Sequence, residues 1–211
     1  SGGVSNIKYS PNGTIIAEDS NGNAWLWENN NSGVIGDGST TALTTPYNVN
    51  KEILNGKKIK LIKIEMLRGL IICEDGSIYV SGDSNLNGQT KWTFMGICEG
   101  ATNGFVTSRK TYIITGENKT WTFGTNCSGS YKGMCGTGNT TDQYIKIPTL
   151  ISNEFTVADL ISDERSILDT NGNVWYWRDS ITPTKVLSDI VAKNTDFSSS
   201  DAVIDINGIV H

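Results

Sequence analysis

The sequence has few of the residues on which most catalytic and nucleic-acid-binding sites depend. Histidine occurs once, as His211 at the last position, so a Ser-His-Asp triad or a Cys/His zinc site cannot be built from this chain alone. Lys and Arg together number 17 against 22 Asp and Glu, which gives a net charge of -5. An acidic chain without a basic run lacks the usual means of holding phosphate backbones. We therefore expect no nucleic-acid partner and no catalytic, cofactor or metal site.

Long apolar runs are also absent from the sequence. No stretch approaches the roughly 20 apolar residues of a membrane-spanning helix, so membrane insertion is not expected. Ser1, Gly2 and Gly3 have neither the basic nor the apolar part of a signal peptide and look like a remnant of cloning. Charged residues make up 18% of the chain, below the roughly 25% of an average domain. A weakly charged chain of 211 residues is expected to fold rather than to remain disordered.

The four cysteines show no Cys-x-x-Cys spacing, which disfavours a metal or thioredoxin-like site. Cys127 and Cys135 bracket a segment containing Gly and Ser that is flexible enough to let the two thiols meet. One interpretation is therefore a Cys127–Cys135 disulfide. The alternative is that these two thiols stay free in a loop, while Cys73 and Cys98 act as small buried hydrophobes.

Glycine is abundant, with 23 residues against 4 prolines, and a Gly-containing pattern recurs along the chain. An apolar run leads to an acidic or polar residue, then to a Gly or Asn turn, then to an alternating aromatic or apolar run. The five copies cover residues 15–27, 71–80, 113–123, 167–177 and 203–210. Asn-Gly and Asp-Gly supply the positive backbone angles of tight turns, so each copy predicts a β-hairpin. The interval between copies is near that of a propeller blade.

Further extended segments flank the hairpins. Alternating runs at 59–64 and 155–161 precede hairpins and predict inner strands. Short segments opened by Pro46, Pro148 and Pro183 follow hairpins and predict outer strands, where proline is tolerated. Inner strand, hairpin and outer strand make a four-stranded antiparallel sheet, and radial repetition of such sheets is a β-propeller.

Aromatic residues two positions apart project from the same face of a strand. The pairs are Trp25 with Trp27, Trp121 with Phe123, and Trp175 with Trp177. Large flat side chains in such pairs suit packing between blades. We prefer this interpretation to the alternative, a solvent-facing platform for a ligand. Trp92 breaks the pattern and is expected to be partly exposed.

The residues after two of these hairpins resemble the repeat of the regulator of chromosome condensation type. Its hallmark is a Trp-x-Trp-Gly-like strand, then Asn, Gly and a Gly-x-Gly, then Thr and Pro. The good copies contain Trp25-Leu26-Trp27, Gly36-Asp37-Gly38 and Pro46, and then Trp121-Thr122-Phe123-Gly124, Gly136-Thr137-Gly138 and Pro148. The second copy lacks the Gly-x-Gly and the fourth has Arg178 in place of the usual Gly, so those two blades are expected to have shorter or altered loops.

The resemblance implies an all-β propeller, in a family whose members form a ring of seven blades. At about 50 residues per blade, this chain suffices for four complete blades and a partial fifth. We expect one propeller domain over residues 4–211, with repeats at about 4–50, 51–98, 99–152, 153–188 and 189–211. Such a chain would be a fragment or an incomplete ring, with exposed blade edges that a partner copy or absent sequence must cover.

The loops are the candidate binding sites, because rigid scaffolds with polar loops often carry their function there. The candidate partner-binding residues are Asn30, Asp37, Ser39, Trp92, Tyr131, Lys132 and Met134. Aromatic and Met side chains in loops are expected to contact something. For Tyr131 and Met134 the alternative is packing against the neighbouring blade.

We expect a non-enzymatic recognition module that binds a protein or glycan on a cell surface. It would belong to a larger secreted or surface-attached bacterial protein with a role in adhesion or receptor binding. Self-association through the exposed blade edges is a further expectation. One alternative is a proteinaceous enzyme inhibitor that caps an active site with loop aromatics. The resemblance also implies guanine-nucleotide exchange on a small GTPase and chromatin binding, which the acidic charge disfavours.

Overall fold

The computed structural model describes residues 3–65, 67–82, 89–107, 109–116, 119–128, 132–162, 165–177, 181–193 and 203–211. These residues form four four-stranded antiparallel sheets and a final two-stranded sheet. The predicted all-β architecture of four complete blades and a partial fifth is therefore confirmed. A short π-helical turn, η1 (Asn50–Leu54), follows the first sheet. No helix among the described residues has the length and hydrophobicity needed to cross a membrane.

Each complete sheet uses four consecutive strands, and strands adjacent in the chain are adjacent in the sheet. The first sheet is β1 (Val4–Tyr9), β2 (Thr14–Asp19), β3 (Ala24–Glu28) and β4 (Leu43–Asn48). The second is β5 (Ile59–Glu65), β6 (Arg68–Cys73), β7 (Ser77–Gly82) and β8 (Gln89–Ile97). The third is β9 (Ala101–Val106), β10 (Lys110–Thr115), β11 (Lys119–Thr125) and β12 (Tyr144–Ser152). The fourth is β13 (Val157–Ser162), β14 (Ser166–Asp169), β15 (Val174–Tyr176) and β16 (Thr184–Leu187), and the last is β17 (Ile190–Lys193) with β18 (Val203–Asp205).

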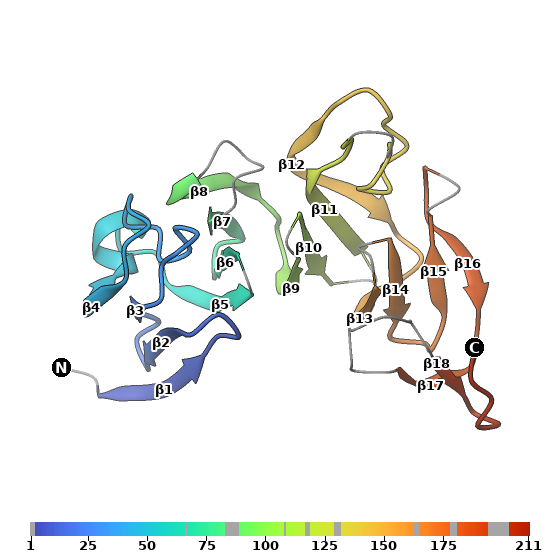
Figure 1. Cartoon of the computed structure of the whole chain (residues 1–211), viewed down its shortest axis with the longest axis horizontal. Coiled ribbons are helices and arrows are strands. Elements are labelled where there is room, and N and C mark those ends of the chain that lie inside the picture. The colour runs from blue at the N-terminus through green and yellow to red at the C-terminus, as the bar shows by residue number, and fades with distance from the viewer. Residues whose placement is uncertain are drawn as a thin grey trace.

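The five sheets stand side by side in an open arc (Figure 1). The first strand of each sheet lies along the concave side, and the fourth strands lie toward the outside. The two chain ends lie at opposite ends of the arc, so the ring is not closed. The predicted inner strands at 59–64 and 155–161 correspond to β5 and β13, although β13 begins at Val157. Pro46 and Pro148 lie within the outer strands β4 and β12 rather than opening them.

An aspartate closes the hairpin turn in the first, fourth and fifth sheets. Asp19 Oδ1 accepts hydrogen bonds from the backbone N–H groups of Asn21 and Asn23, both at 2.9 Å. Asp169 and Asp205 make the same pair of bonds to the residues two and four positions on. Each aspartate carboxylate thus supplies an acceptor for turn N–H groups that face no neighbouring strand. The Asp-x-Asn-Gly sequence thus folds into the predicted hairpin by its own local bonds.

Apolar clusters fill the junctions between successive sheets. Between the second and third sheets, Trp121 and Phe123 pack against Leu70, Ile72 and Ile78. Between the third and fourth, Trp175 and Trp177 join the cluster that contains Tyr112 and Ile114. Each fully buried apolar side chain of this size contributes roughly 1.5–3 kcal/mol. The prediction that these aromatic pairs form blade-to-blade core is confirmed for both pairs.

Backbone hydrogen bonds also join the hairpin turns of the first and fourth sheets to the next sheet. The N–H of Ile59, at the start of β5, donates to the Gly22 carbonyl at 3.1 Å. The N–H of Ile190, at the start of β17, donates to the Gly172 carbonyl at 2.9 Å. Gly22 and Gly172 therefore face the following blade. We call the end of each sheet that carries these turns the turn side. The opposite end, which carries the long loops after β3 and β11, is called the loop side.

Candidate functional site

The loop after β3 is closed by Asn30, whose side chain is fully buried. Its Nδ2 donates to Asp37 Oδ1 at 3.0 Å and to the carbonyl oxygens of Ser39 and Thr41 at 3.1 and 3.2 Å. Its Oδ1 accepts from the N–H of Ile35 at 3.0 Å. One amide thus satisfies several groups of its own loop. The prediction that Asn30 contacts a partner is wrong, because its side chain has no exposed surface.

Asp37 and Ser39, the other two predicted contacts in this loop, are half-buried. The Ser39 N–H donates to Asp37 Oδ1, and Ser39 Oγ donates to Asp37 Oδ2, both at 2.9 Å. The structure does bring Asn30, Asp37 and Ser39 together, as the sequence suggested. Their polar atoms are hydrogen-bonded to one another, however, so these three residues fix the shape of the loop. Only the half-exposed surfaces of Asp37 and Ser39 remain accessible to a partner.

Asn126 closes the loop after β11 in the same way. Its Oδ1 accepts from the N–H of Cys135 at 3.1 Å, and its Nδ2 donates to the carbonyls of Asn139 and Asp142 at 2.9 and 3.1 Å. Sequence reasoning missed the shared role of Asn30 and Asn126. The signal was present, because each lies three residues after the second aromatic of its strand.

The predicted contacts in the second of these loops differ in exposure. Met134 is buried, and its carbonyl accepts from Lys110 Nζ at 2.8 Å and from Trp177 Nε1 of the next blade at 3.0 Å. The interpretation of Met134 as a partner contact is therefore wrong, and it packs at the blade junction instead. Lys132 is exposed, and its contact with a partner stays a prediction. Tyr131 lies outside the described residues.

All four cysteines are free thiols. Cys127 Sγ donates to the Thr140 carbonyl at 3.5 Å, and the buried Cys135 Sγ donates to the Thr125 carbonyl at 3.4 Å. The two thiols are engaged by different backbone groups, so the Cys127–Cys135 disulfide is not formed and the free-thiol alternative describes this structure. Cys73 and Cys98 are buried, and burial raises the pKa of each thiol to about 11.

Trp92 lies on β8 with 5% of its surface exposed, so the prediction of a partly exposed, partner-binding Trp is wrong. Its Nε1 donates to the Ile35 carbonyl in the loop of the preceding blade at 2.7 Å. A Cβ on Gly69 would lie 2.5 Å from both Ser81 Oγ and the Trp92 ring. Ser81 pairs with Gly69 at the register position where Phe123 pairs with Thr111 in the third sheet. Because serine is much smaller than phenylalanine, the Trp92 ring occupies the space beside it.

A groove of about 750 Å³ runs along the start of β12 on the loop side. Its walls are Thr137, Asn139, Asp142, Gln143, Tyr144, Ile145, Lys146, Ile147 and Thr149. β12 is the last strand of its sheet, so one of its edges has no strand partner within that sheet. Ile147 is 66% exposed, and Lys146 beside it is exposed as well. We take this β12 groove as the candidate functional site.

One wall of the β12 groove is held in place before any partner arrives. Asn139 Oδ1 accepts from the N–H groups of Thr141 and Asp142 at 3.0 and 2.9 Å, and Asn139 Nδ2 donates to Asp142 Oδ2 at 2.7 Å. Such preorganisation lowers the entropy lost on binding. Sequence reasoning predicted the outer strand at Pro148 but did not identify its edge as a binding site. The signal it overlooked was the proline itself, which is tolerated at a sheet edge.

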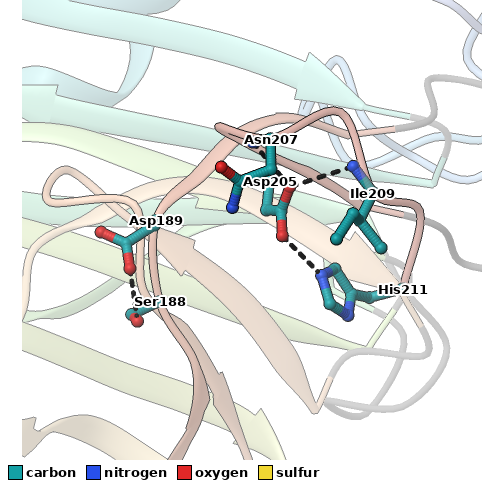
Figure 2. A network of polar contacts seen from close by, with 6 residues as sticks. All are labelled: Ser188, Asp189, Asp205, Asn207, Ile209 and His211. Carbon is teal, nitrogen blue, oxygen red and sulfur yellow. Dashed lines mark hydrogen bonds and ion pairs between the residues drawn. The ribbon is translucent and has the colours of Figure 1, made fainter.

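The only histidine serves the last hairpin rather than a reaction centre. Figure 2 shows the Asp205 carboxylate between its own turn and the His211 ring. His211 Nε2 lies 3.1 Å from Asp205 Oδ2, while Asp205 Oδ1 accepts from the N–H groups of Asn207 and Ile209 at 2.8 and 3.0 Å. The hydrogen bond from His211, together with the backbone donors, lowers the pKa of Asp205. In the described part of the chain, no three His, Cys, Asp or Glu residues are grouped to hold a metal ion.

Antiparallel four-stranded sheets standing in an arc, each with its first strand inside, define the β-propeller class. No family model and no curated protein matches the chain. Among solved structures it is similar to yeast RCC1 (Prp20) bound to Kap60, with a TM-score of 0.67 and 15% identity, and to Prp20p from Saccharomyces cerevisiae, with 0.66 and 16%. Human WBSCR16 gives a TM-score of 0.63 and 14% identity.

These similarities cover 98%, 98% and 91% of this chain, but only 55%, 57% and 55% of the three known chains. The chain therefore spans a little over half the length of the proteins it matches. Its fold is that of an RCC1-like propeller, as the repeat pattern implied.

Proposed function

We propose that the chain is a non-enzymatic recognition module that binds a protein partner through the loop side of its propeller. The observation that carries the proposal is the β12 groove, in which an outer strand with one unpaired edge borders a prearranged loop. An extended segment of a partner can add to such an edge through backbone hydrogen bonds, and pockets for its side chains supply specificity. The exposed Ile147 would meet an apolar side chain of that segment.

The similar structures support a protein partner. Yeast RCC1 is described in complex with Kap60, and Prp20p is described with binding properties toward Gsp1p and histones. For the present chain we place the module outside the cell or at its surface, as part of a larger bacterial adhesion or receptor-binding protein. The support is its acidic net charge together with polar loops rich in Asn, Ser, Thr and Gly, a composition that gives little electrostatic attraction for nucleic acid.

The inhibitor alternative has less support than the sequence gave it. It relied on aromatic loop residues, such as Trp92, that could enter an active site. Trp92 is buried, however, and its Nε1 donates a hydrogen bond to the Ile35 carbonyl. Exchange-factor activity is also a weaker proposal, since its only support is a likeness of fold to yeast RCC1 chains at 15% and 16% identity.

The test is binding of the labelled full chain to bacterial and mammalian cells, before and after separate protease and glycosidase treatment. We expect protease treatment alone to abolish binding, whereas loss after glycosidase alone would replace the protein partner by a glycan. The variant Ile147→Asp removes an apolar contact from the groove and should reduce binding at least tenfold. Val186→Asp is the matched control, because Val186 is 50% exposed on the outer strand of another blade. Equal binding by both variants would contradict the β12 groove as the site.

A further inference from the structure

Two lysine side chains of β5 connect the inner strand of the second sheet to that of the third. Lys60 Nζ donates to the Ala101 carbonyl at 2.7 Å, and Lys63 Nζ donates to the Gly104 carbonyl at 2.8 Å. Ala101 and Gly104 both lie on β9. Each contact places an amino group against a backbone oxygen. Lys63 additionally reaches a side-chain amide, whose carbon an amine can attack.

That amide belongs to Asn103, on the same strand β9. Lys63 Nζ donates to Asn103 Oδ1 at 3.1 Å. Because a C=O bond is about 1.2 Å long, Asn103 Cγ lies at most about 4.3 Å from Nζ. The N–H of Gly104 also donates to Oδ1, at 2.9 Å. This second donor polarises the carbonyl and would stabilise negative charge that develops on its oxygen.

The surroundings of Lys63 favour the neutral amine that such an attack requires. Lys63 is half-buried, and its Nζ lies over the Phe105 ring, 4.9 Å from the ring centre. Burial lowers the pKa of Lys63, Glu65 acts in the opposite direction, and Lys8 lowers the pKa further. A lysine amine is a nucleophile only after it has lost its proton, and removal from water is a usual means of activating it.

Glu65 supplies a carboxyl group on the same face of β5. It follows Lys63 by two residues, and side chains two apart on a strand project from one face. Burial raises the pKa of the half-buried Glu65, and Lys63 lowers it in part. The pKa values of the amine and the carboxyl group are thus brought closer together. Moving a proton from Lys63 to Glu65 and back consequently costs less than it would in water.

We propose that Lys63 and Asn103 become joined by a covalent amide bond, which the chain forms by itself between β5 and β9. Lys63 Nζ gives one proton to the Glu65 carboxylate, and its lone pair bonds to Asn103 Cγ while the C=O π electrons move to Oδ1. Glu65 returns the proton to Nδ2, and the Cγ–Nδ2 bond breaks as the carbonyl reforms. Ammonia leaves with the second proton from Nζ. The products are a secondary amide and one ammonium ion, with Glu65 regenerated.

The bond would join the second and third blades covalently at their inner strands. Its two residues are 40 positions apart in the sequence, so the cross-link restricts the unfolded chain as a disulfide would. The blade junction could then open only by breaking a covalent bond. This reaction is independent of partner binding at the β12 groove, and the failure of either proposal leaves the other standing.

The test is the intact mass of the purified full chain during incubation at neutral pH. We expect the mass to fall by one molecule of ammonia, and a protease digest to contain a branched peptide that joins β5 to β9. Lys63→Arg keeps the positive charge but lacks the nucleophile, so this variant should retain its full mass. Lys60→Arg is the matched control and should react like the unmodified chain, because Lys60 contacts a backbone carbonyl that has no leaving group.

The role of Glu65 is tested by two substitutions of that residue. Glu65→Gln has nearly the same shape but cannot carry a proton, so the reaction should slow at least about a hundredfold. Glu65→Asp retains a carboxyl group and should recover a measurable part of the rate, which a merely structural role would not explain. Equal rates in Glu65→Gln and the unmodified chain would overturn the role of Glu65. Circular dichroism and urea midpoints confirm that each variant is folded.

An unmodified chain that keeps its full mass after long incubation would overturn the proposal. Loss of ammonia that persists in Lys63→Arg would overturn it as well, because Asn103 would then have formed a cyclic imide with the Gly104 nitrogen. Conversion of Asn103 to Asp without a branched peptide would have the same meaning, since water rather than Lys63 would have taken the amide carbon.

Discussion

Trp92 offers the most direct test of how neighbouring blades hold each other. Its ring is buried and its Nε1 is bonded to the Ile35 carbonyl. Trp92→Ala should lower the free energy of unfolding by about 3–5 kcal/mol, the range for deleting a buried aromatic side chain. Trp92→Phe retains most of the ring but leaves a buried carbonyl without its donor, so the expected loss is about 1–3 kcal/mol.

Gly36 makes the test specific to this contact. A Cβ at Gly36 would lie 2.3 Å from the Trp92 ring, and its φ of 75° already disfavours other residues. Gly36→Ala alone should therefore suffer both the collision and the backbone strain. In a Trp92→Ala background the collision disappears, and only the strain of about 1–2 kcal/mol remains.

The assay is urea unfolding followed by far-UV circular dichroism, applied to both single variants and the double variant. A coupling energy of at least about 1 kcal/mol is expected, because residues in contact do not act additively. Strictly additive effects, or a Trp92→Ala variant as stable as the unmodified chain, would refute the placement of Trp92 at the blade junction. A stable Trp92→Ala variant with weakened cell binding would instead favour the exposed, partner-binding Trp that the sequence suggested.

Three further predictions follow from the loop, the turn and the thiols. Asn126→Ala should lower the free energy of unfolding by about 1–3 kcal/mol, since it leaves buried backbone groups unpaired; urea unfolding measures it. Burial acts to raise the pKa of Asp169, but donors from Trp175, Asn173 and the turn backbone lower it overall. The stability that Asp169 provides is thus complete above pH 3.8 and falls as the pH drops below it, and Asp169→Ala should reduce this acid-dependent loss in an unfolding series. Thiol titration without reductant should find four reactive groups in urea, with Cys73 and Cys98 unreactive in the native state because their pKa of about 11 leaves little thiolate.

Each of these predictions has its own control. Asn153→Ala changes an exposed asparagine and should leave stability within about 0.5 kcal/mol; an equal loss in Asn126→Ala and Asn153→Ala would count against the loop closure. An Asp169→Ala variant with an unchanged acid profile would remove Asp169 as its source. Fewer than four thiols in unreduced, unfolded protein would restore the Cys127–Cys135 disulfide.

The repeat pattern predicted the fold because its signals are local. Asp, Asn and Gly at fixed offsets determine a turn whichever blade surrounds it, and the alternating runs beside Asp19 and Asp169 determine the strands. The aromatic pairs Trp121 with Phe123 and Trp175 with Trp177 also predicted which face of their strand packs against the neighbouring blade. Loop lengths followed the same logic: residues 29–42 and 126–143 separate third and fourth strands in the first and third sheets, against 83–88 in the second, where a shorter loop was expected.

The candidate site was harder to predict because exposure depends on contacts distant in sequence. Trp92 is buried by a loop more than fifty residues earlier, through Ile35 and Gly36. Nothing in the residues around Trp92 shows that Ser81 leaves a space for its ring. Asn30 looked like a loop tip because polar residues favour surfaces, but its amide is hydrogen-bonded to four residues of its own loop. The β12 groove arises only when the 137–142 turn folds beside β12.

The turn side of the molecule has a consequence for how such chains change over evolutionary time. The aspartate turn at Asp19 is completed by bonds within five residues, and the carbonyls of Gly22, Gly76 and Gly172 each accept an N–H from the chain that leads into the next blade. A duplicated blade would therefore find a ready-made neighbour on both sides, and the deletion of a whole blade would bring two compatible surfaces together. Changes smaller than a blade would leave one face of a junction without the side chains that cover it. Selection on such a chain should consequently act on entire repeats, with the loops diversifying independently at the opposite end.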